Sequence, residues 1–231
     1  LELGAFGIPA KRKRAMALEA AEQICNMMVL TPYPGYEGEG FSMPCRNVLP
    51  KPLQDPHPKL WMACTNRDTI KVAAQNGIGA LAFSFIDPEE ALHWSKIYYD
   101  IIKSEECVPL GWNVNANIAI VSAFSMHEDR AEAIRRGQDN FEFFRYSQQR
   151  LVAHDFVPGY SDMWSDFREK RGDASDKLIQ AALERGEYDG AGIGTPDDML
   201  RHLKSFQDCG VDQVIMLQQA GKNSHQNICE S

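Results

Sequence analysis

The chain has 231 residues, enough for one large domain or two small ones. Hydrophobic residues make up 44%, a normal value for a globular protein with a core, and the formal net charge of −8 argues against a general nucleic-acid binder. No apolar run approaches the roughly 18 residues needed to span a bilayer, so we expect neither a membrane nor a nucleic-acid partner.

Six cysteines are scattered along the chain without a CxxC pair, and no cysteine and histidine cluster has zinc spacing. This pattern indicates free thiols in a reducing cytoplasm and no metal site. The cysteines are Cys25, Cys45, Cys64, Cys107, Cys209 and Cys229.

Residues 10–30 are predicted to form a helix, because small and apolar side chains recur on one face at a spacing of 3.6 residues. Prolines at 32 and 34 end it. Glycines and prolines in the next stretch predict short extended pieces, with a small hairpin among them. The prolines around His57 then hold the chain extended and prevent a helix before Leu60.

Strands and helices alternate over the rest of the chain. Four short apolar runs predict strands: "LWMAC" (60–64), "ALAFSF" (80–85), "NVNANIAIVSAF" (113–124) and "DQVIML" (212–217). The helices expected between them are 69–76, a helix capped by Asp87, about 127–154, and 194–210 with Thr195 as its cap. In the third strand Asn113, Asn115 and Asn117 occupy one face, where they need hydrogen-bond partners.

This order is typical of βαβ units and a parallel sheet. Four strands fit either a doubly wound sheet or one half of an eight-stranded barrel. The chain starts at Leu1 and ends within a helix-like "SHQNICES", so we expect a fragment cut at both ends, which favours the barrel. Within 125–193, the polar, aromatic-rich part from 154 onward indicates a lid or a partner-contacting excursion.

In a barrel, functional groups lie where strands end and helices begin. The most informative of these points is Thr65–Thr69, where Thr65 and Asn66 offer a hydroxyl and an amide and Thr69 begins a helix. Free N–H groups at a helix start, with such donors around them, form an anion site that suits a phosphate. The alternative is that Asn66 or Asp68 simply caps the helix.

Two histidines are interpreted as structural. His225, after the last strand, fits a capping or surface position, and His57 fits a turn between prolines. The chain contains no GxGxxG, Walker, GxSxG or HExxH motif. A nucleophile-based hydrolase and a metalloenzyme therefore have no support.

The stretch "LPKPLQDPHPKLWMACTNRDTIKVAAQNGIGAL" resembles the central segment of the bacterial luciferase-like monooxygenases. "GTPDDMLRHLKSFQDCGVDQVIML" is similar to the last helix and strand of that family, and "LGAFGIP" to the segment after its fourth barrel strand. The resemblance implies a TIM (β/α)8 barrel of which strands five to eight are present, with an insertion after strand seven. It also implies one partial-barrel domain over 1–231, in which 125–193 is the insertion or lid.

The resemblance further implies a flavin-dependent monooxygenase that uses reduced FMN and molecular oxygen to oxidise a small organic substrate. Cofactor-binding residues carried over are Thr65, Asn66 and Thr69, and no catalytic residue is carried over. A flavin reductase and a homodimer or heterodimer partner are implied as well. Two alternatives stay open: a deazaflavin-dependent oxidoreductase of the same fold, and a non-catalytic flavoprotein or partner subunit.

Overall fold

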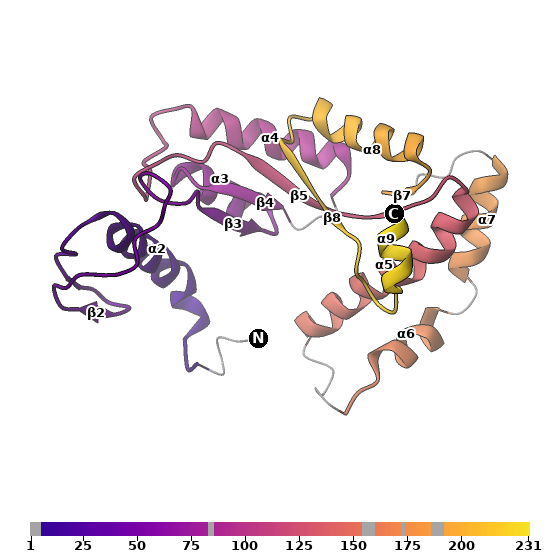
Figure 1. Cartoon of the computed structure of the whole chain (residues 1–231), viewed down its shortest axis with the longest axis horizontal. Helices are drawn as coiled ribbons and strands as arrows, with labels where there is room; N and C mark the ends of the chain where they lie inside the picture. Colours follow the sequence, from indigo (N-terminus) through magenta and orange to yellow (C-terminus); the bar gives the residue numbers. More distant parts are fainter. Residues whose placement is uncertain (1–5, 83–85, 154–159, 172–173, 186–191) are drawn as a thin grey trace. The chain divides into compact units, whose positions relative to one another are not determined.

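The chain folds into two compact units in a computed structural model (Figure 1). The structure describes residues 6–82, 86–153, 160–171, 174–185 and 192–231. The sheet unit consists of residues 6–120 and Phe206–Val214, and the helical unit consists of Val121–Ser205 and Ile215–Ser231, within those described ranges.

The sheet unit begins with a short 3₁₀ turn, η1 (Ala10–Arg12), and the long helix α2 (Lys13–Val29). This confirms the helix predicted over 10–30. Its apolar face is only partly covered, since the side chain of Ile24 is 51% exposed. Ala17 is exposed as well.

A small antiparallel hairpin follows α2, as predicted, with strands β1 (Tyr36–Glu37) and β2 (Ser42–Met43). Glu19 of α2 holds it by accepting hydrogen bonds from the Tyr36 hydroxyl at 2.9 Å and from the Gly40 N–H at 2.8 Å. One carboxylate thus fixes the hairpin against the helix.

The main sheet has four strands in the order β3 (Trp61–Cys64), β4 (Gly79–Ala82), β5 (Ile118–Ala123) and β8 (Gln213–Leu217). β3, β4 and β5 run parallel, with Trp61 opposite Gly79 and Ala80 opposite Ile118. The structure therefore confirms an α/β fold with a parallel sheet. Residues 83–85 of the second predicted strand lie outside the described residues.

The third predicted strand starts later than expected. β5 begins at Ile118, whereas the alternation of side chains predicted a start at Asn113. The amide of Asn115 donates to the Leu60 carbonyl at 2.8 Å, and that of Asn117 donates to Asn115 Oδ1 at 2.7 Å. The asparagine row thus bonds within itself and to the loop before β3, because short amide side chains compete with strand pairing for backbone groups.

Helices α3 (Arg67–Gln75) and α4 (Pro88–Ile102) lie alongside the strands of the sheet (Figure 1). Their apolar sides join those of β3–β5 in one buried core, and Met62 packs against it. On the other side of β3, Trp61 is 39% exposed and Ala63 is exposed. The largest core side chains are Ile70, Trp94, Tyr98, Ile102, Ile118, Ile120 and Phe206.

His57 is a structural residue, as predicted. Its ring is buried, Nδ1 lies 2.8 Å from the Pro58 carbonyl oxygen, and Nε2 accepts the Trp112 N–H at 3.0 Å. Both ring nitrogens are therefore used to join the loop before β3 to the loop before β5.

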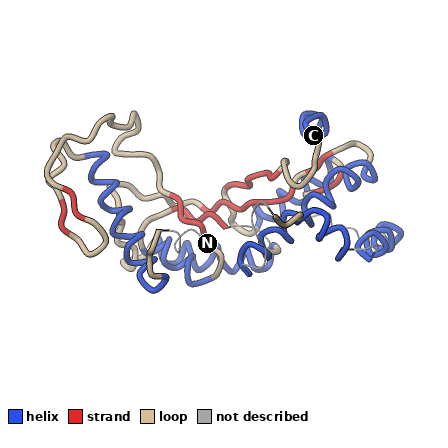
Figure 2. Tube along the Cα trace, turned by 90° about the horizontal axis from the view of Figure 1, so that it is seen from below, coloured by secondary structure: helices blue, strands red, loops and turns tan. Residues whose placement is uncertain are grey.

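The helical unit contains α5 (Arg130–Ala153), α6 (Met163–Arg171) and α7 (Ala174–Arg185). Figure 2 shows all helices of the chain in blue. A short parallel pair, β6 (Ser125–Met126) and β7 (Ile193–Gly194), precedes α8 (Pro196–Asp208), and α9 (His225–Glu230) comes last. β5, α8 and β8 each cross from one unit into the other. Among the described helices, none combines the length and apolar character of a bilayer-spanning segment.

Arg171 links three helices of this unit through a buried charge. Its side chain is 3% exposed, and its nitrogens lie 2.8 Å from Asp139, 2.6 Å from Glu142 and 2.8 Å from Asp176. Asp139 and Glu142 belong to α5 and Asp176 belongs to α7. The Arg171 guanidinium of α6 therefore joins α5 to α7. The carboxylate partners offset the cost of removing the guanidinium charge from water.

Candidate functional site

The start of α3 is a capping box built from Asn66 and Thr69. Asn66 Oδ1 accepts the Thr69 N–H at 3.0 Å, and Thr69 Oγ1 accepts the N–H groups of Thr65 at 3.1 Å and Asn66 at 3.3 Å. The Thr69 hydroxyl donates to the Asn66 carbonyl at 2.8 Å. A cap of this kind stabilises a helix by about 1 kcal/mol.

The cap does not consume every donor at this point. Within the described residues, the Thr65 hydroxyl, the Asn66 Nδ2 group and the backbone N–H groups of Arg67 and Asp68 have no hydrogen-bond partner. The first N–H groups of a helix lack intrahelical acceptors and carry the positive end of the helix dipole. Thr65 and Asn66 are therefore free to donate to an anion, whereas the Thr69 hydroxyl is committed to the cap.

Arg67 is turned toward the start of the neighbouring helix α4. Its Nε lies 2.8 Å from Glu90 Oε1 and its Nη2 lies 2.6 Å from Glu90 Oε2. Glu90 Oε1 also accepts the indole N–H of Trp94. The guanidinium, and after it the indole, lower the pKa of Glu90 to about 2, so the carboxylate is charged at neutral pH.

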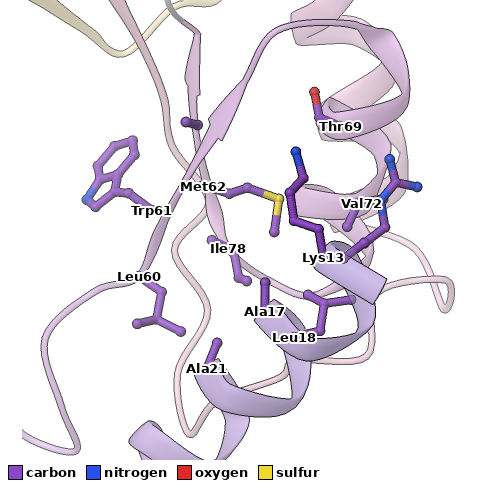
Figure 3. A pocket seen from close by; sticks show the side chains of 12 residues that line it. Lys13, Ala17, Leu18, Ala21, Leu60, Trp61, Met62, Thr69, Val72 and Ile78 are labelled. Atoms are coloured by element: carbon purple, nitrogen blue, oxygen red, sulfur yellow. The ribbon is translucent and has the colours of Figure 1, made fainter. Parts of the chain in front are cut away.

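A pocket of about 370 Å³ lies between α2, β3 and α3, and Thr69 is on its wall (Figure 3). Lys13 and Arg14 line the same pocket, and the Lys13 ammonium points toward Thr69 in Figure 3. Neither cation makes an ion pair with any residue that the structure describes. The rest of the lining is largely apolar and includes Ala17, Leu18, Ala21, Leu60, Met62, Val72 and Ile78.

Sequence reasoning missed Lys13 and Arg14 as site residues. Their signal was the run "KRKR" at 11–14, which places cations at the start of α2 without an acidic residue in its first turn. Cations at a helix N-terminus are repelled by the positive end of the helix dipole and destabilise the helix. Their presence here therefore indicates a role other than helix stability. Both cations line the same pocket as Thr69 of the α3 cap.

Cys64, directly before this site, is not a nucleophile. Its side chain is fully buried, and burial raises the pKa of its thiol to about 11, so the thiol stays protonated at neutral pH. All six cysteines are free, as the sequence indicates. No three potential metal ligands among His, Cys, Asp and Glu gather anywhere in the described parts of the chain.

The other strand ends supply less chemistry. The Ser125 hydroxyl is buried and donates to the Ala133 carbonyl at 3.0 Å, so it serves packing. His225 is exposed on α9, whose cap is Ser224, which agrees with the predicted surface position. Ser84 lies outside the described residues.

The chain matches the family model described as luciferase-like monooxygenase over residues 1–213. It has no significant match among curated proteins.

Three solved structures illustrate the similarity of fold. Monooxygenase RslO1 from Streptomyces bottropensis is 20% identical with a TM-score of 0.63, over 98% of this chain and 60% of that one. The coenzyme F420 dependent tetrahydromethanopterin reductase from Methanopyrus kandleri is 15% identical with a TM-score of 0.57, over 93% and 60%. The oxygenating constituent of 3,6-diketocamphane monooxygenase from Pseudomonas putida, in complex with FMN, is 14% identical with a TM-score of 0.50, over 85% and 53%. The chain thus spans at most 60% of these proteins.

Proposed function

The chain belongs to the luciferase-like monooxygenase family, and on that premise we propose that it forms part of a flavin-dependent monooxygenase. The enzyme would use reduced FMN and molecular oxygen to oxidise a small organic substrate. A flavin reductase would supply the reduced cofactor, and the working form would be a homodimer or heterodimer.

We propose further that the chain is the C-terminal half of a TIM barrel, in which β3, β4, β5 and β8 are strands five to eight. Their order in one sheet, the parallel pairing of β3, β4 and β5, and the helices between them support this assignment. So does the exposed side of β3, where Trp61 and Ala63 would face the barrel interior. In this arrangement 1–231 is one partial-barrel domain, and 125–193, which holds α5–α7, is its insertion or lid.

The observation that carries the functional proposal is that Lys13 and Arg14 line one pocket together with Thr69 of the α3 cap. Thr65 and Asn66 are joined to Thr69 by the capping box, so their donors and the backbone N–H groups of Arg67 and Asp68 would act beside the two cations on a phosphate. Anions bind well at a helix N-terminus, where N–H groups and the helix dipole act together. The donor set therefore fits the phosphate of FMN.

The residues of this site would bind and orient the cofactor. Lys13 and Arg14 would neutralise the phosphate, and Asn66 would donate through Nδ2 while Oδ1 keeps its cap. Thr69 would hold Thr65 and Asn66 in place through the capping box. With the cofactor bound, the apolar pocket wall would exclude water beside the charges, which would strengthen charge-assisted hydrogen bonds. When bound, the reduced flavin supplies the electrons with which oxygen is activated.

A deazaflavin remains the second candidate cofactor, because the Methanopyrus kandleri neighbour is named as dependent on coenzyme F420. The phosphate-binding groups described above would serve either cofactor. Oxygen uptake with reduced FMN supports the monooxygenase, and turnover only with a reduced deazaflavin supports the alternative. A stable complex with another chain and no turnover with either cofactor would indicate a partner subunit.

The test of the site is Asn66→Asp in the full-length protein. Aspartate is as good a cap as asparagine, but it loses the Nδ2 donor and adds a negative charge beside the phosphate. We expect FMN binding to weaken at least tenfold and riboflavin binding, which involves no phosphate, to change little.

The control is Asp87→Asn at the cap of α4, which makes the reverse exchange of amide and carboxylate away from the pocket and should leave FMN affinity nearly unchanged. Equal losses of FMN and riboflavin affinity in Asn66→Asp would mean that the α3 start is only a cap.

A further inference from the structure

Arg67 is the cation nearest in sequence to the proposed phosphate site, yet its charge is directed elsewhere. Both of its hydrogen bonds go to Glu90, at 2.8 and 2.6 Å, in a fork that uses both carboxylate oxygens. Glu90 is itself fixed in the first turn of α4, where its N–H donates to Asp87 Oδ1 at 2.8 Å. Its carboxylate also accepts the Trp94 indole N–H, so three bonds orient the pair.

The position of Arg67 makes this pairing consequential. Arg67 is the first residue of α3, and its backbone N–H is one of the donors that would face the phosphate. Its guanidinium and the Glu90 carboxylate carry opposite charges in direct contact, so their fields largely cancel at the site. An exposed ion pair adds little to stability, and the side chains here are 53% and 31% exposed. The pair therefore matters more for where the charge points than for the free energy of unfolding.

We propose that Glu90 is a specificity-determining residue of the anion site, because it withholds Arg67 from the cofactor phosphate and thereby limits the affinity for phosphate-bearing ligands. This inference rests on the proposed function of the site. It assigns the positive charge that acts on the phosphate to Lys13 and Arg14 alone. It also implies that the Arg67 guanidinium can interact with the phosphate only when the Glu90 side chain is uncharged.

The experiment is Glu90→Gln in the full-length protein, with FMN and riboflavin affinities measured by titration calorimetry. Glutamine has the same shape and still accepts from Trp94, so the fold should persist, and Trp fluorescence checks this. We expect FMN to bind roughly three- to tenfold more tightly, the effect of one freed charge near the surface, and the gain to shrink with added salt. Riboflavin affinity should stay the same.

Two matched variants identify the cause. Glu89→Gln removes the same charge one residue earlier, from a side chain that does not bind Arg67, and should change FMN affinity less than twofold. Arg67→Ala added to Glu90→Gln should abolish the gain. An unchanged FMN affinity in Glu90→Gln, an equal gain in Glu89→Gln, or a gain that survives Arg67→Ala would overturn the inference.

A second measurement separates this inference from the proposed function. Inorganic phosphate should raise the melting temperature of Glu90→Gln more than that of the unaltered protein, and only when Arg67 is present. Failure of the unaltered protein to bind FMN would contradict the proposed function alone. Equal stabilisation of both proteins by phosphate would contradict the role of Glu90.

Discussion

The starts of α3 and α4 share one design and differ in what surrounds them. Asn66 and Asp87 each accept the N–H of the residue three positions later, at 3.0 and 2.8 Å. Each helix follows a strand of the same sheet. Their local geometry alone would make both of them anion sites.

The starts of α3 and α4 differ in their charged residues and in the backbone N–H groups that they offer. At α4, Pro88 has no N–H group to offer and two glutamates already occupy the first turn. At α3, Asp68 is acidic in the first turn, but two N–H groups are unpaired within the described residues, and Lys13 and Arg14 of α2 line the adjoining pocket. On the proposed assignment, a helix start binds an anion only where tertiary packing places cations beside it, and four experiments can break or sharpen this comparison.

The largest effect is expected when the 231-residue chain is produced without the rest of the proposed barrel. The 231-residue chain by itself would leave the edges of β3 and β8 unpaired, together with the exposed side of β3. We expect it to aggregate or dimerise, to lack a sharp monomeric unfolding transition, and to bind FMN too weakly to detect. Light scattering and calorimetry would show this. A sharp monomeric transition with tight FMN binding would contradict the half-barrel proposal.

The next largest effect is expected from Lys13→Gln combined with Arg14→Gln in the full-length protein. Each charge-assisted contact with a phosphate contributes about a factor of ten, so FMN affinity should fall about 100-fold. Riboflavin affinity should fall far less, and calorimetric titration would measure both. The control is Lys11→Gln with Arg12→Gln, which removes two charges from the same basic run outside the pocket. Similar losses in both double variants would make the effect one of net charge.

A smaller effect is expected from removing the caps themselves. Asn66→Ala and Asp87→Ala should each lower the free energy of unfolding by about 1 kcal/mol, as measured by urea titration. Only Asn66→Ala should also weaken FMN binding, by about tenfold, because it deletes a donor to the phosphate. If Asp87→Ala weakened FMN binding to the same degree, the two helix starts would not differ in function.

The smallest effect concerns pH and the Arg67–Glu90 pair. The pKa of Glu90 is about 2, below its ordinary value of 4.5, because the folded protein pairs the charged form with Arg67. A depressed pKa stabilises the fold above pH 4.5, and this contribution is lost as the pH falls from 4.5 toward 2. Urea midpoints between pH 6 and about 2.5 should therefore fall slightly more in the unaltered protein than in Glu90→Gln. Identical slopes would show that the pair is not maintained in solution.

Local sequence patterns predicted most of the elements, because capping residues and apolar spacing act over a few residues. Asp87, Thr195 and the prolines after them marked the starts of α4 and α8, and the structure places both helices there. The start of β5 was predicted wrongly, since alternation continues back to Asn113 while Asn115 bonds the backbone of Leu60. That partner is distant in sequence, so alternation alone could not reveal it.

The same division holds for the candidate site. Within ten residues the sequence determined the Asn66–Thr69 cap and the acidic start of α4, because a cap needs only residues three positions apart. Tertiary structure alone decided that Lys13 and Arg14, some fifty residues before the cap, share its pocket, and that Glu90 rather than a ligand holds Arg67. Charges act through space, so their partners follow from how α2 and α4 pack beside α3 and not from their order along the chain.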